Sequence, residues 1–116
     1  MYALNFYSPI VEGQLRSGRK SATIRLGDKS AKYRKGMVVA VLAGARFSPR
    51  RKVFDAVIDK VEVKRLCDLS PNEIEHDNPG IRRVHEMQQF LGTLYNREVF
   101  DEDLVTVIRF SEIRSA

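Results

Sequence analysis

Apolar and polar residues alternate along several short segments of the chain, which is the pattern of half-buried β-strands. The alternation is present at residues 2–7 and 21–26, and a closing strand is expected at "DLVTVIRF", residues 103–110. The continuous apolar run "MVVAVLA", residues 37–43, predicts a strand covered on both faces. A long strand is expected at residues 53–65, where the alternation slips between "VFDAVI" and "DKVEV", as a β-bulge or a barrel corner would cause.

Three segments between these strands have the features of helices. "SPIVEGQLRSG" predicts a short helix that has Pro9 at its first position and ends where Gly18 can adopt a left-handed conformation. "SPNE", residues 70–73, has the spacing of a capping box and predicts the start of a second helix. A third helix is expected from residue 81 to about residue 96, because apolar residues recur there with helical spacing. Those residues are Ile81, Val84, Leu91, Leu94 and Tyr95.

The order of these elements predicts the class of fold. About five strands with inserted helices, most of them connected locally, indicate an α+β domain built on a small β-barrel of five to six strands. A closed barrel is favoured over an open sheet because the strand runs look covered on both faces. The chain of 116 residues has the length of one ordinary domain, so we expect residues 1–116 to form a single domain.

Composition bears on the expected cellular location and on membrane association. No apolar run approaches the length of a membrane span, and "MYALNFYSPI" lacks the layout of a signal peptide, so we expect no membrane association. Cys67 is the single cysteine and cannot form an internal disulfide, which favours a cytoplasmic location and a small core residue at that position. A monomer is favoured.

Charge is distributed unevenly between the two parts of the chain. Residues 1–52 contain 12 Lys or Arg and 2 acidic residues, for a net charge of +10, whereas residues 53–116 contain 8 and 13, for −5. Such a split indicates one positive face and favours a polyanionic partner whose phosphates accept hydrogen bonds from the cations. Charge kept only for solubility is the alternative.

The stretch "SGRKSATIRLGD", residues 17–28, places basic side chains where a helix ends and a strand begins. Thr23 and Arg25 share a polar face of a regular strand, whereas Lys20 can join them only if the strand begins after it. If the three converge, Arg25 could hold a phosphate or a carbonyl through its fork of donors. Burial and like charge would lower the pKa of Lys20, and its neutral form could then take a proton from the threonine hydroxyl or from water. In a structural alternative, the helix dipole favours these cations and the strand favours threonine.

Gly18, Lys20 and Arg25 resemble the G-x-K-x-x-x-x-R signature of ASCH domains, a branch of the PUA-like superfamily. The wider string, a downstream turn glycine, the following apolar strand, the inserted helices and the closing "VTVIRF" strand extend the similarity over roughly residues 4–111. The resemblance implies a β-barrel surrounded by helices, with a cleft beside the signature strand. It also implies binding of RNA or of a modified nucleoside in that cleft, with Gly18, Arg19 and Arg25 among the binding residues.

One bacterial branch of this family consists of small amidohydrolases that remove the acetyl group from N4-acetylcytidine. Their catalytic lysine and threonine match Lys20 and Thr23, and Asp77 in "NEIEHDNPG" stands where they have a glutamate. As the alternative to a binding function, resemblance to this branch implies a hydrolase in which Lys20 is the base, Thr23 the nucleophile or the group that positions water, and Asp77 the acid. Asp77 keeps the carboxylate but has one methylene less. Ribonuclease activity, linked to another branch, is a less favoured alternative.

A second group of candidate binding residues lies in the basic segment "GARFSPRRK". Arg46, Arg50 and Arg51 surround Phe47, and cations beside an aromatic ring that can stack on a base suit single-stranded RNA. In the alternative, Phe47 simply anchors the loop. Tyr33 either borders the cleft or holds its own loop in place.

The acidic segment "EIEHD", residues 73–77, is interpreted as helix capping and solvated surface rather than as a metal site, because the second histidine comes only at His85. We therefore expect no metal and no cofactor. A protein-interaction module whose basic face docks an acidic partner is the third functional hypothesis.

Overall fold

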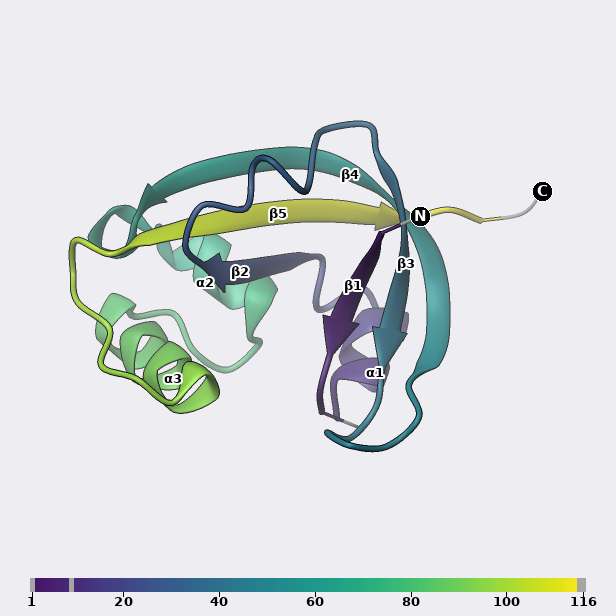
Figure 1. Ribbon diagram of the computed structural model, residues 1–116, viewed down its shortest axis with the longest axis horizontal. Coiled ribbons are helices and arrows are strands. Elements are labelled where there is room, and N and C mark those ends of the chain that lie inside the picture. Colours follow the sequence, from purple (N-terminus) through teal and green to yellow (C-terminus); the bar gives the residue numbers. More distant parts are fainter. Residues whose placement is uncertain (1, 9, 115–116) are drawn as a thin grey trace.

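The computed structural model describes residues 2–8 and 10–114, and within these ranges a single curled sheet of five strands carries three α-helices (Figure 1). The strands are β1 (Ala3–Phe6), β2 (Ala22–Leu26), β3 (Val38–Ala43), β4 (Arg51–Arg65) and β5 (Leu104–Glu112). The helical elements are α1 (Ile10–Arg16), the 3-10 turn η1 (Leu66–Asp68), α2 (Pro71–Asp77) and α3 (Val84–Tyr95).

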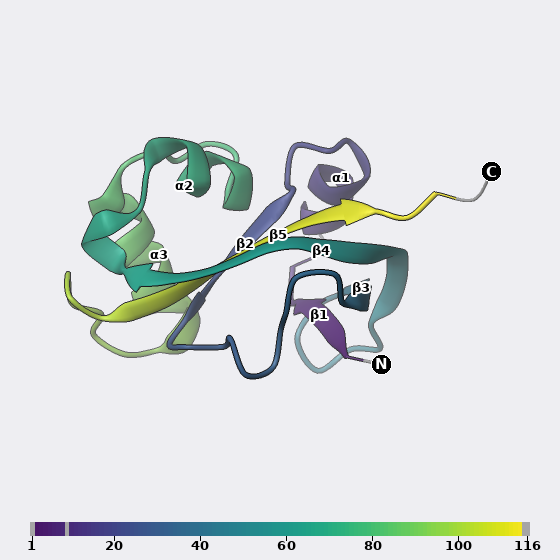
Figure 2. The ribbon, with the colours of Figure 1, turned by 90° about the horizontal axis from the view of Figure 1, so that it is seen from above.

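The strands are arranged in the order β1-β3-β4-β5-β2, so that β1 and β2 form the two edges of the sheet. β1 runs parallel to β3, and the other neighbouring pairs are antiparallel. Figure 2 shows that α1 and α2 lie on one side of β4 and β5, with β1 and β3 on the other side. The predicted α+β class built on a small curled sheet is confirmed. The prediction of a closed barrel is wrong, because β1 and β2 do not pair within the described residues and the sheet forms a half barrel.

β4 is the strand around which the sheet bends. Its first part pairs with β3, and its later part pairs with β5. The register with β5 shifts between Ile58 and Lys60, so the predicted irregularity between "VFDAVI" and "DKVEV" is confirmed as a bulge. Because a bulge adds a residue and increases the local twist, one strand of 15 residues can serve both parts of the sheet.

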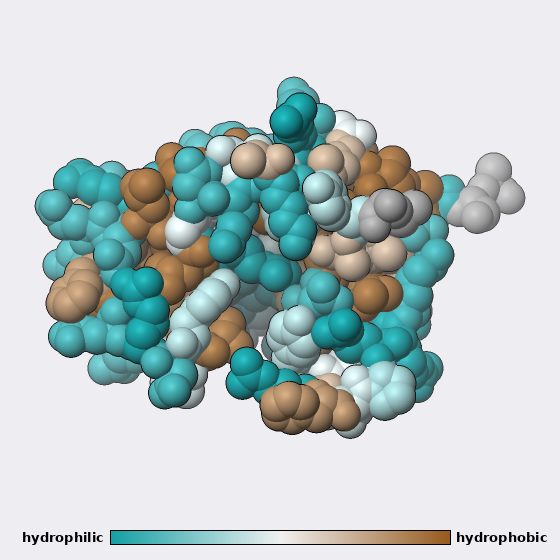
Figure 3. Space-filling model, viewed as in Figure 1, coloured by the Kyte–Doolittle hydropathy of each residue, from teal (hydrophilic) through white to brown (hydrophobic). Residues whose placement is uncertain are grey.

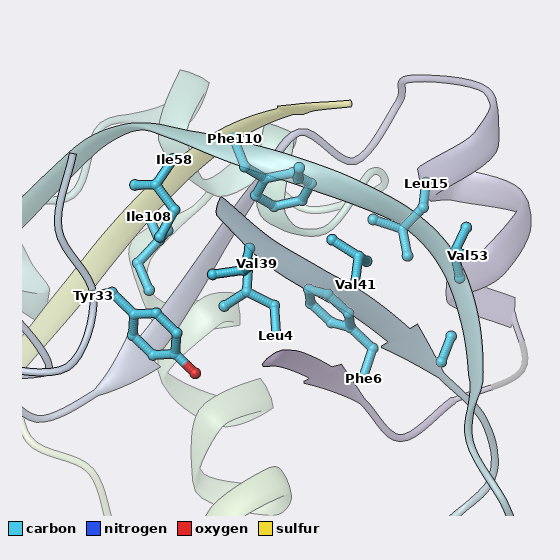
Figure 4. Packing of buried hydrophobic residues seen from close by; sticks show 12 residues of the cluster. Leu4, Phe6, Leu15, Tyr33, Val39, Val41, Val53, Ile58, Ile108 and Phe110 are labelled. Atoms are coloured by element: carbon cyan, nitrogen blue, oxygen red, sulfur yellow. The ribbon is translucent and has the colours of Figure 1, made fainter. Parts of the chain in front are cut away.

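Buried side chains form two clusters. The first lies among β1, β3, the first part of β4 and α1, and Figure 4 shows how its side chains point toward one another. The second joins β2 and β5 to α2 and α3, with Ile74, Met87 and Leu91 supplied by the two helices. Full burial of such a side chain contributes about 1.5–3 kcal/mol, so the helices are held to the sheet by these contacts.

The ends of the first two helices are formed as the sequence predicts. Ser70 and Glu73 make both hydrogen bonds of a capping box at the start of α2. Gly18 has a φ of +78°, the left-handed conformation expected where the first helix closes. Pro9, predicted at the first position of that helix, lies outside the described residues. None of the helices in the described ranges combines the length and hydrophobicity needed to cross a bilayer.

The prediction for the third helix is wrong at its start and in part of its apolar stripe. The backbone is not helical before Val84, since Gly80 has a φ of +118° and Arg83 is extended. Leu91 is buried as expected, but Leu94 and Tyr95 are exposed, because the last turn of α3 lies outside the second cluster.

Two further predictions of burial are wrong. Strand β3 is fully covered on one face only: Val39 and Val41 are fully buried, whereas on the other face Val38 is exposed and Ala40 and Leu42 are half-buried. A continuous apolar run therefore occurs here in a strand with one open face. Cys67 is exposed rather than part of the core, because it lies in η1, where Leu66 is the residue that turns inward.

Candidate functional site

Lys20 is buried at the junction between α1 and β2. The turn at Gly18 follows the helix, and β2 begins only at Ala22, so Lys20 precedes the strand and is not bound by its alternation. Its side chain is 5% exposed. Nζ donates hydrogen bonds to the carbonyl oxygen of Ala22 at 3.0 Å, to that of Asp77 at 2.6 Å, and to Asp77 Oδ1 at 3.0 Å.

Asp77 contacts Lys20 although it lies 57 positions later in the sequence, in the helical segment between β4 and β5. It is the last residue of α2, and its Oδ1 also accepts a hydrogen bond from the backbone N–H of Ile24 at 3.0 Å. The backbone N–H of Ser21 donates to the carbonyl of His76, which fixes the end of the helix against the start of β2. The carboxylate predicted to face Lys20 thus lies beside it.

Thr23 and Arg25 lie next to each other on β2. Arg25 Nε donates to Thr23 Oγ1 at 2.9 Å, and Arg25 Nη2 donates to the carbonyl oxygen of Asn5 at 3.1 Å. Because Asn5 belongs to β1, a side chain rather than a backbone ladder connects the two edges of the half barrel. Thr23 is buried, and Arg25 is half-buried.

Phe6 is a member of this site that the sequence analysis did not identify. Its ring centroid lies 4.9 Å from Lys20 Nζ and 5.1 Å from Arg25 Cζ, within the range of cation–π attraction. The alternation in "YALNFY" points Phe6 inward, but only the curl of the sheet brings β1 opposite the basic segment. We call Phe6, Lys20, Thr23, Arg25 and Asp77 the Lys20 cluster.

Burial lowers the pKa of Lys20 below its ordinary value of 10.5, because an ammonium group removed from water loses hydration. The Asp77 carboxylate opposes the shift through its charge and its hydrogen bond, and the Arg25 guanidinium adds to it. The three N–H groups of the ammonium match its three acceptors, so deprotonation removes one hydrogen bond. Lys20 therefore loses its proton more readily than a surface lysine.

Two members of the cluster, together with Tyr95, cover the free edge of β2. Lys20 bonds the carbonyl of Ala22, Asp77 bonds the N–H of Ile24, and the hydroxyl of Tyr95 accepts from the N–H of Leu26 at 3.3 Å. Three side chains from outside the strand thus occupy positions that a neighbouring strand would take. Tyr95 serves this edge from the end of α3, and periodicity had placed it in the core instead.

The other candidate residues lie outside the cluster. Arg19 is exposed, and Gly18 forms part of the turn. Tyr33 is buried, and its hydroxyl donates to the carbonyl of Ala3 at 2.8 Å, an arrangement that ties its loop to β1.

The candidate residues of the basic segment do not belong to the Lys20 cluster. Arg46, Phe47 and Arg50 lie in the loop between β3 and β4, and Arg51 is the first residue of β4. The structure therefore separates the candidate binding residues into a buried cluster and an exposed loop.

One hollow borders the cluster, and a separate depression is visible on the face shown in Figure 3. An open hollow of about 340 Å³ has Gly18 and Lys20 in its wall, together with Phe54 and Phe110. On the face seen in Figure 3, hydrophilic side chains surround a depression between the α2–α3 end and the β1–β3 end. No group of three or more His, Cys, Asp or Glu side chains in the described ranges is placed to hold a metal ion.

The sequence matches no protein-family model and no curated protein. Solved structures of other proteins share the fold, and three of them are compared with this chain. An ASCH domain from Lactobacillus crispatus JV V101 superposes with a TM-score of 0.65 at 11% identity, over 96% of this chain and 80% of that chain. Protein EF3133 from Enterococcus faecalis V583 gives 0.68 at 15% identity over 97% and 78%, and the hypothetical protein PH0355 gives 0.61 at 15% over 97% and 100%. The chain therefore has the fold of an ASCH-type, PUA-like domain.

Proposed function

We propose that this protein binds RNA or a modified nucleoside through the Lys20 cluster and the basic surface around it. The observation that carries the proposal is the state of the twelve cations in residues 1–52. Among the described residues, only Arg16, Lys20 and Lys52 of these twelve form ion pairs. In residues 53–116, by contrast, six of eight cations are paired, namely Lys60, Lys64, Arg65, Arg82, Arg97 and Arg114.

Unpaired cations suit a phosphate backbone because they need not break an internal ion pair before they bind. Each phosphate that they neutralise releases counterions, which favours binding at low salt. Within the Lys20 cluster, Arg25 is the member best placed to contact a ligand, since it is half-buried and uses Nε and one Nη for internal hydrogen bonds. Its remaining N–H donors suit a phosphate or a base carbonyl.

The test is binding of a fluorescent single-stranded RNA, measured by anisotropy at salt concentrations from about 50 to about 200 mM. Wild-type affinity is expected to fall as salt rises. The variant Arg46→Ala/Arg50→Ala/Arg51→Ala removes three unpaired cations, and should reduce the slope of log K against log salt by about 2.

The matched control is Lys60→Ala/Arg82→Ala/Arg114→Ala, which removes three cations that pair with Glu62, Glu75 and Glu112. It loses the same formal charge but is expected to keep most of the slope. The proposal fails if wild type does not bind at low salt, if binding is insensitive to salt, or if both triple variants lose affinity equally. Competition by heparin without competition by RNA would instead assign the basic face to an acidic protein partner.

A second candidate function is hydrolysis of an acylated nucleoside amide such as N4-acetylcytidine, as the ASCH resemblance implies. The observation that favours it is the buried Lys20, whose pKa burial lowers, close to a buried threonine and a carboxylate. Water would be consumed: an oxygen attacks the acyl carbon, the C–N bond breaks, and the departing amine takes a proton, so that acetate and cytidine are released.

One feature of the cluster limits this second function. Within the described residues, no hydrogen bond joins Lys20 Nζ to Thr23 Oγ1; the hydroxyl oxygen accepts from Arg25 instead. Direct proton transfer would require Lys20 to leave one of its three acceptors, or a water molecule to connect the two groups.

The test is release of cytidine from N4-acetylcytidine by wild type, Thr23→Ser and Thr23→Val. If the threonine hydroxyl attacks or positions water, the serine variant keeps activity and the valine variant loses at least a hundredfold. Equal rates for Ser and Val would remove Thr23 from the chemistry, and no cytidine release by wild type would exclude this substrate.

A further inference from the structure

Two exposed aromatic rings with arginine partners lie beyond the C-terminal end of β1. Tyr7 is 47% exposed, and the guanidinium carbon of Arg50 lies 5.3 Å from its ring centroid. Phe47 is fully exposed, and the corresponding carbon of Arg46 lies 5.9 Å from its ring centroid. We call Tyr7, Arg46, Phe47 and Arg50 the Tyr7–Phe47 surface.

Phe47 is held in a conformation that an aromatic residue rarely adopts. Its φ is +66°, in the left-handed region where glycine and asparagine are favoured and a bulky side chain is strained. The ring gains no burial in return, because the side chain is fully exposed. Anchoring of the loop by Phe47 therefore does not account for the ring.

The Tyr7–Phe47 surface is joined to the Lys20 cluster through the backbone at the end of β1. Tyr7 directly follows Phe6, whose ring lies near both Lys20 and Arg25. The loop that bears Phe47 starts at Gly44, whose N–H donates to the carbonyl of Phe6 at 3.1 Å. Gly44 also has the backbone of Pro49 and Arg50 within 3.2 Å of where a Cβ would stand, so the loop folds back closely onto this point.

We infer that the ligand is a single-stranded RNA of several nucleotides, one of which contacts Arg25 of the Lys20 cluster while its neighbours stack on Tyr7 and Phe47. This inference rests on the proposed function and names its substrate class: an oligonucleotide rather than a free nucleoside. Arg46 and Arg50 have no acidic partner among the described residues and are free to contact the phosphates between stacked bases. Stacking on aromatic rings tolerates any base, so the surface adds affinity without sequence preference.

The experiment compares cytidine monophosphate with oligocytidylates of three and six nucleotides, using wild type, Phe47→Gly, Tyr7→Ala and the control Phe100→Ala. Phe100 is also an exposed aromatic residue, 54% accessible, but it lies beside the acidic segment at residues 101–103. Wild type should bind the hexamer at least tenfold more tightly than the monophosphate. Phe47→Gly and Tyr7→Ala should each lose about tenfold for the hexamer and nothing for the monophosphate, whereas Phe100→Ala should match wild type.

Phe47→Gly separates a binding role from a structural one. Glycine accepts a positive φ, so this variant should be at least as stable as wild type while it binds the hexamer more weakly. Affinity that does not depend on length, or a Phe47→Gly variant that binds the hexamer as tightly as wild type, overturns the inference and leaves the proposed function standing. Failure of wild type to bind both the monophosphate and the hexamer overturns the two together. Tighter binding to polyglutamate than to the hexamer would assign the surface to an acidic protein.

Discussion

Two lysine–carboxylate pairs fasten the two ends of α2 to the sheet, and they differ in depth. Lys64 on β4 meets Glu73 in the first turn of the helix at 2.9 Å, and Lys20 before β2 meets Asp77 at its last residue at 3.0 Å. The Lys64 side chain is 20% exposed and that of Lys20 is 5% exposed. Similar distances thus join similar groups in two different environments.

The pKa values of the two lysines shift in opposite directions. Partial burial works against the charge of Lys64, but hydrogen bonding and attraction to Glu73, with Glu62 nearby, raise its pKa above 10.5. For Lys20, burial outweighs the carboxylate and the pKa falls. A neighbouring carboxylate alone therefore does not set the direction in which the pKa of a lysine shifts. The depth of burial decides whether the carboxylate raises that pKa or is outweighed by the loss of hydration.

The largest expected effect is on stability at the deeper pair. Lys20→Met leaves the Asp77 carboxylate buried without its cation, and should lower the free energy of unfolding by about 3–5 kcal/mol. The double variant Lys20→Met/Asp77→Asn removes the stranded charge and keeps an oxygen for the Ile24 N–H, so it should recover more than half of the loss. Urea denaturation of the three proteins measures both numbers. A single variant as stable as wild type would show that the pair is not buried in solution.

The same substitution at the shallower pair should cost much less. Lys64→Met is expected to lower the free energy of unfolding by about 1 kcal/mol, because solvent screens the pair. Glu73 also keeps its hydrogen bonds with Ser70 in the capping box. The same urea measurement checks this prediction. A loss as large as that of Lys20→Met would remove the distinction between the two pairs.

Titration should separate the two lysines directly. NMR of protein with labelled lysine side chains should give Lys20 a pKa below 10.5 and Lys64 a pKa above it. Asp77→Asn should lower the pKa of Lys20 further, because the carboxylate opposes the shift. A Lys20 that titrates at or above Lys64 would contradict the ordering.

The smallest expected effect is the loss, at low pH, of the stability that Glu73 contributes. Although burial alone would raise it, hydrogen bonds from Ser70 and the Lys64 ammonium lower the pKa of Glu73 below 4.5. A lowered carboxyl pKa stabilises the fold above about pH 4.5, and that stabilisation is lost as the pH falls through the lowered value. The difference in stability between wild type and Glu73→Gln should therefore shrink as the pH drops below 4.5. A difference that stays constant from pH 6 to pH 2 would oppose this assignment.

Much of the fold could be predicted because it depends on local signals. Alternation located β1, β2 and β4, the slip between "VFDAVI" and "DKVEV" located the bulge, and Ser70 with Glu73 located the start of α2. The exposure of Cys67 and the open face of β3 could not be predicted, because both depend on which layers cover an element rather than on its own pattern.

The candidate site likewise contains residues that could be predicted from the sequence and residues that could not. Local spacing brought Thr23 and Arg25 together, and the resemblance pointed to Asp77 as the facing carboxylate. Phe6 and Tyr95 escaped notice because their roles arise from strand order and from the end of a helix distant in sequence. The pattern of apolar and polar residues in "YALNFY" or around Tyr95 contains no information about these long-range contacts.

The side chains along the outer margin of β2 have a consequence for solubility. An uncovered strand margin recruits a strand from another molecule and seeds aggregation. Here an ammonium, a carboxylate and a phenol block that recruitment. A ligand that displaced Lys20 and Asp77 from these hydrogen bonds would therefore expose the outer margin of β2 while it is bound. Self-association of the protein would then increase with the fraction of protein that is bound to ligand.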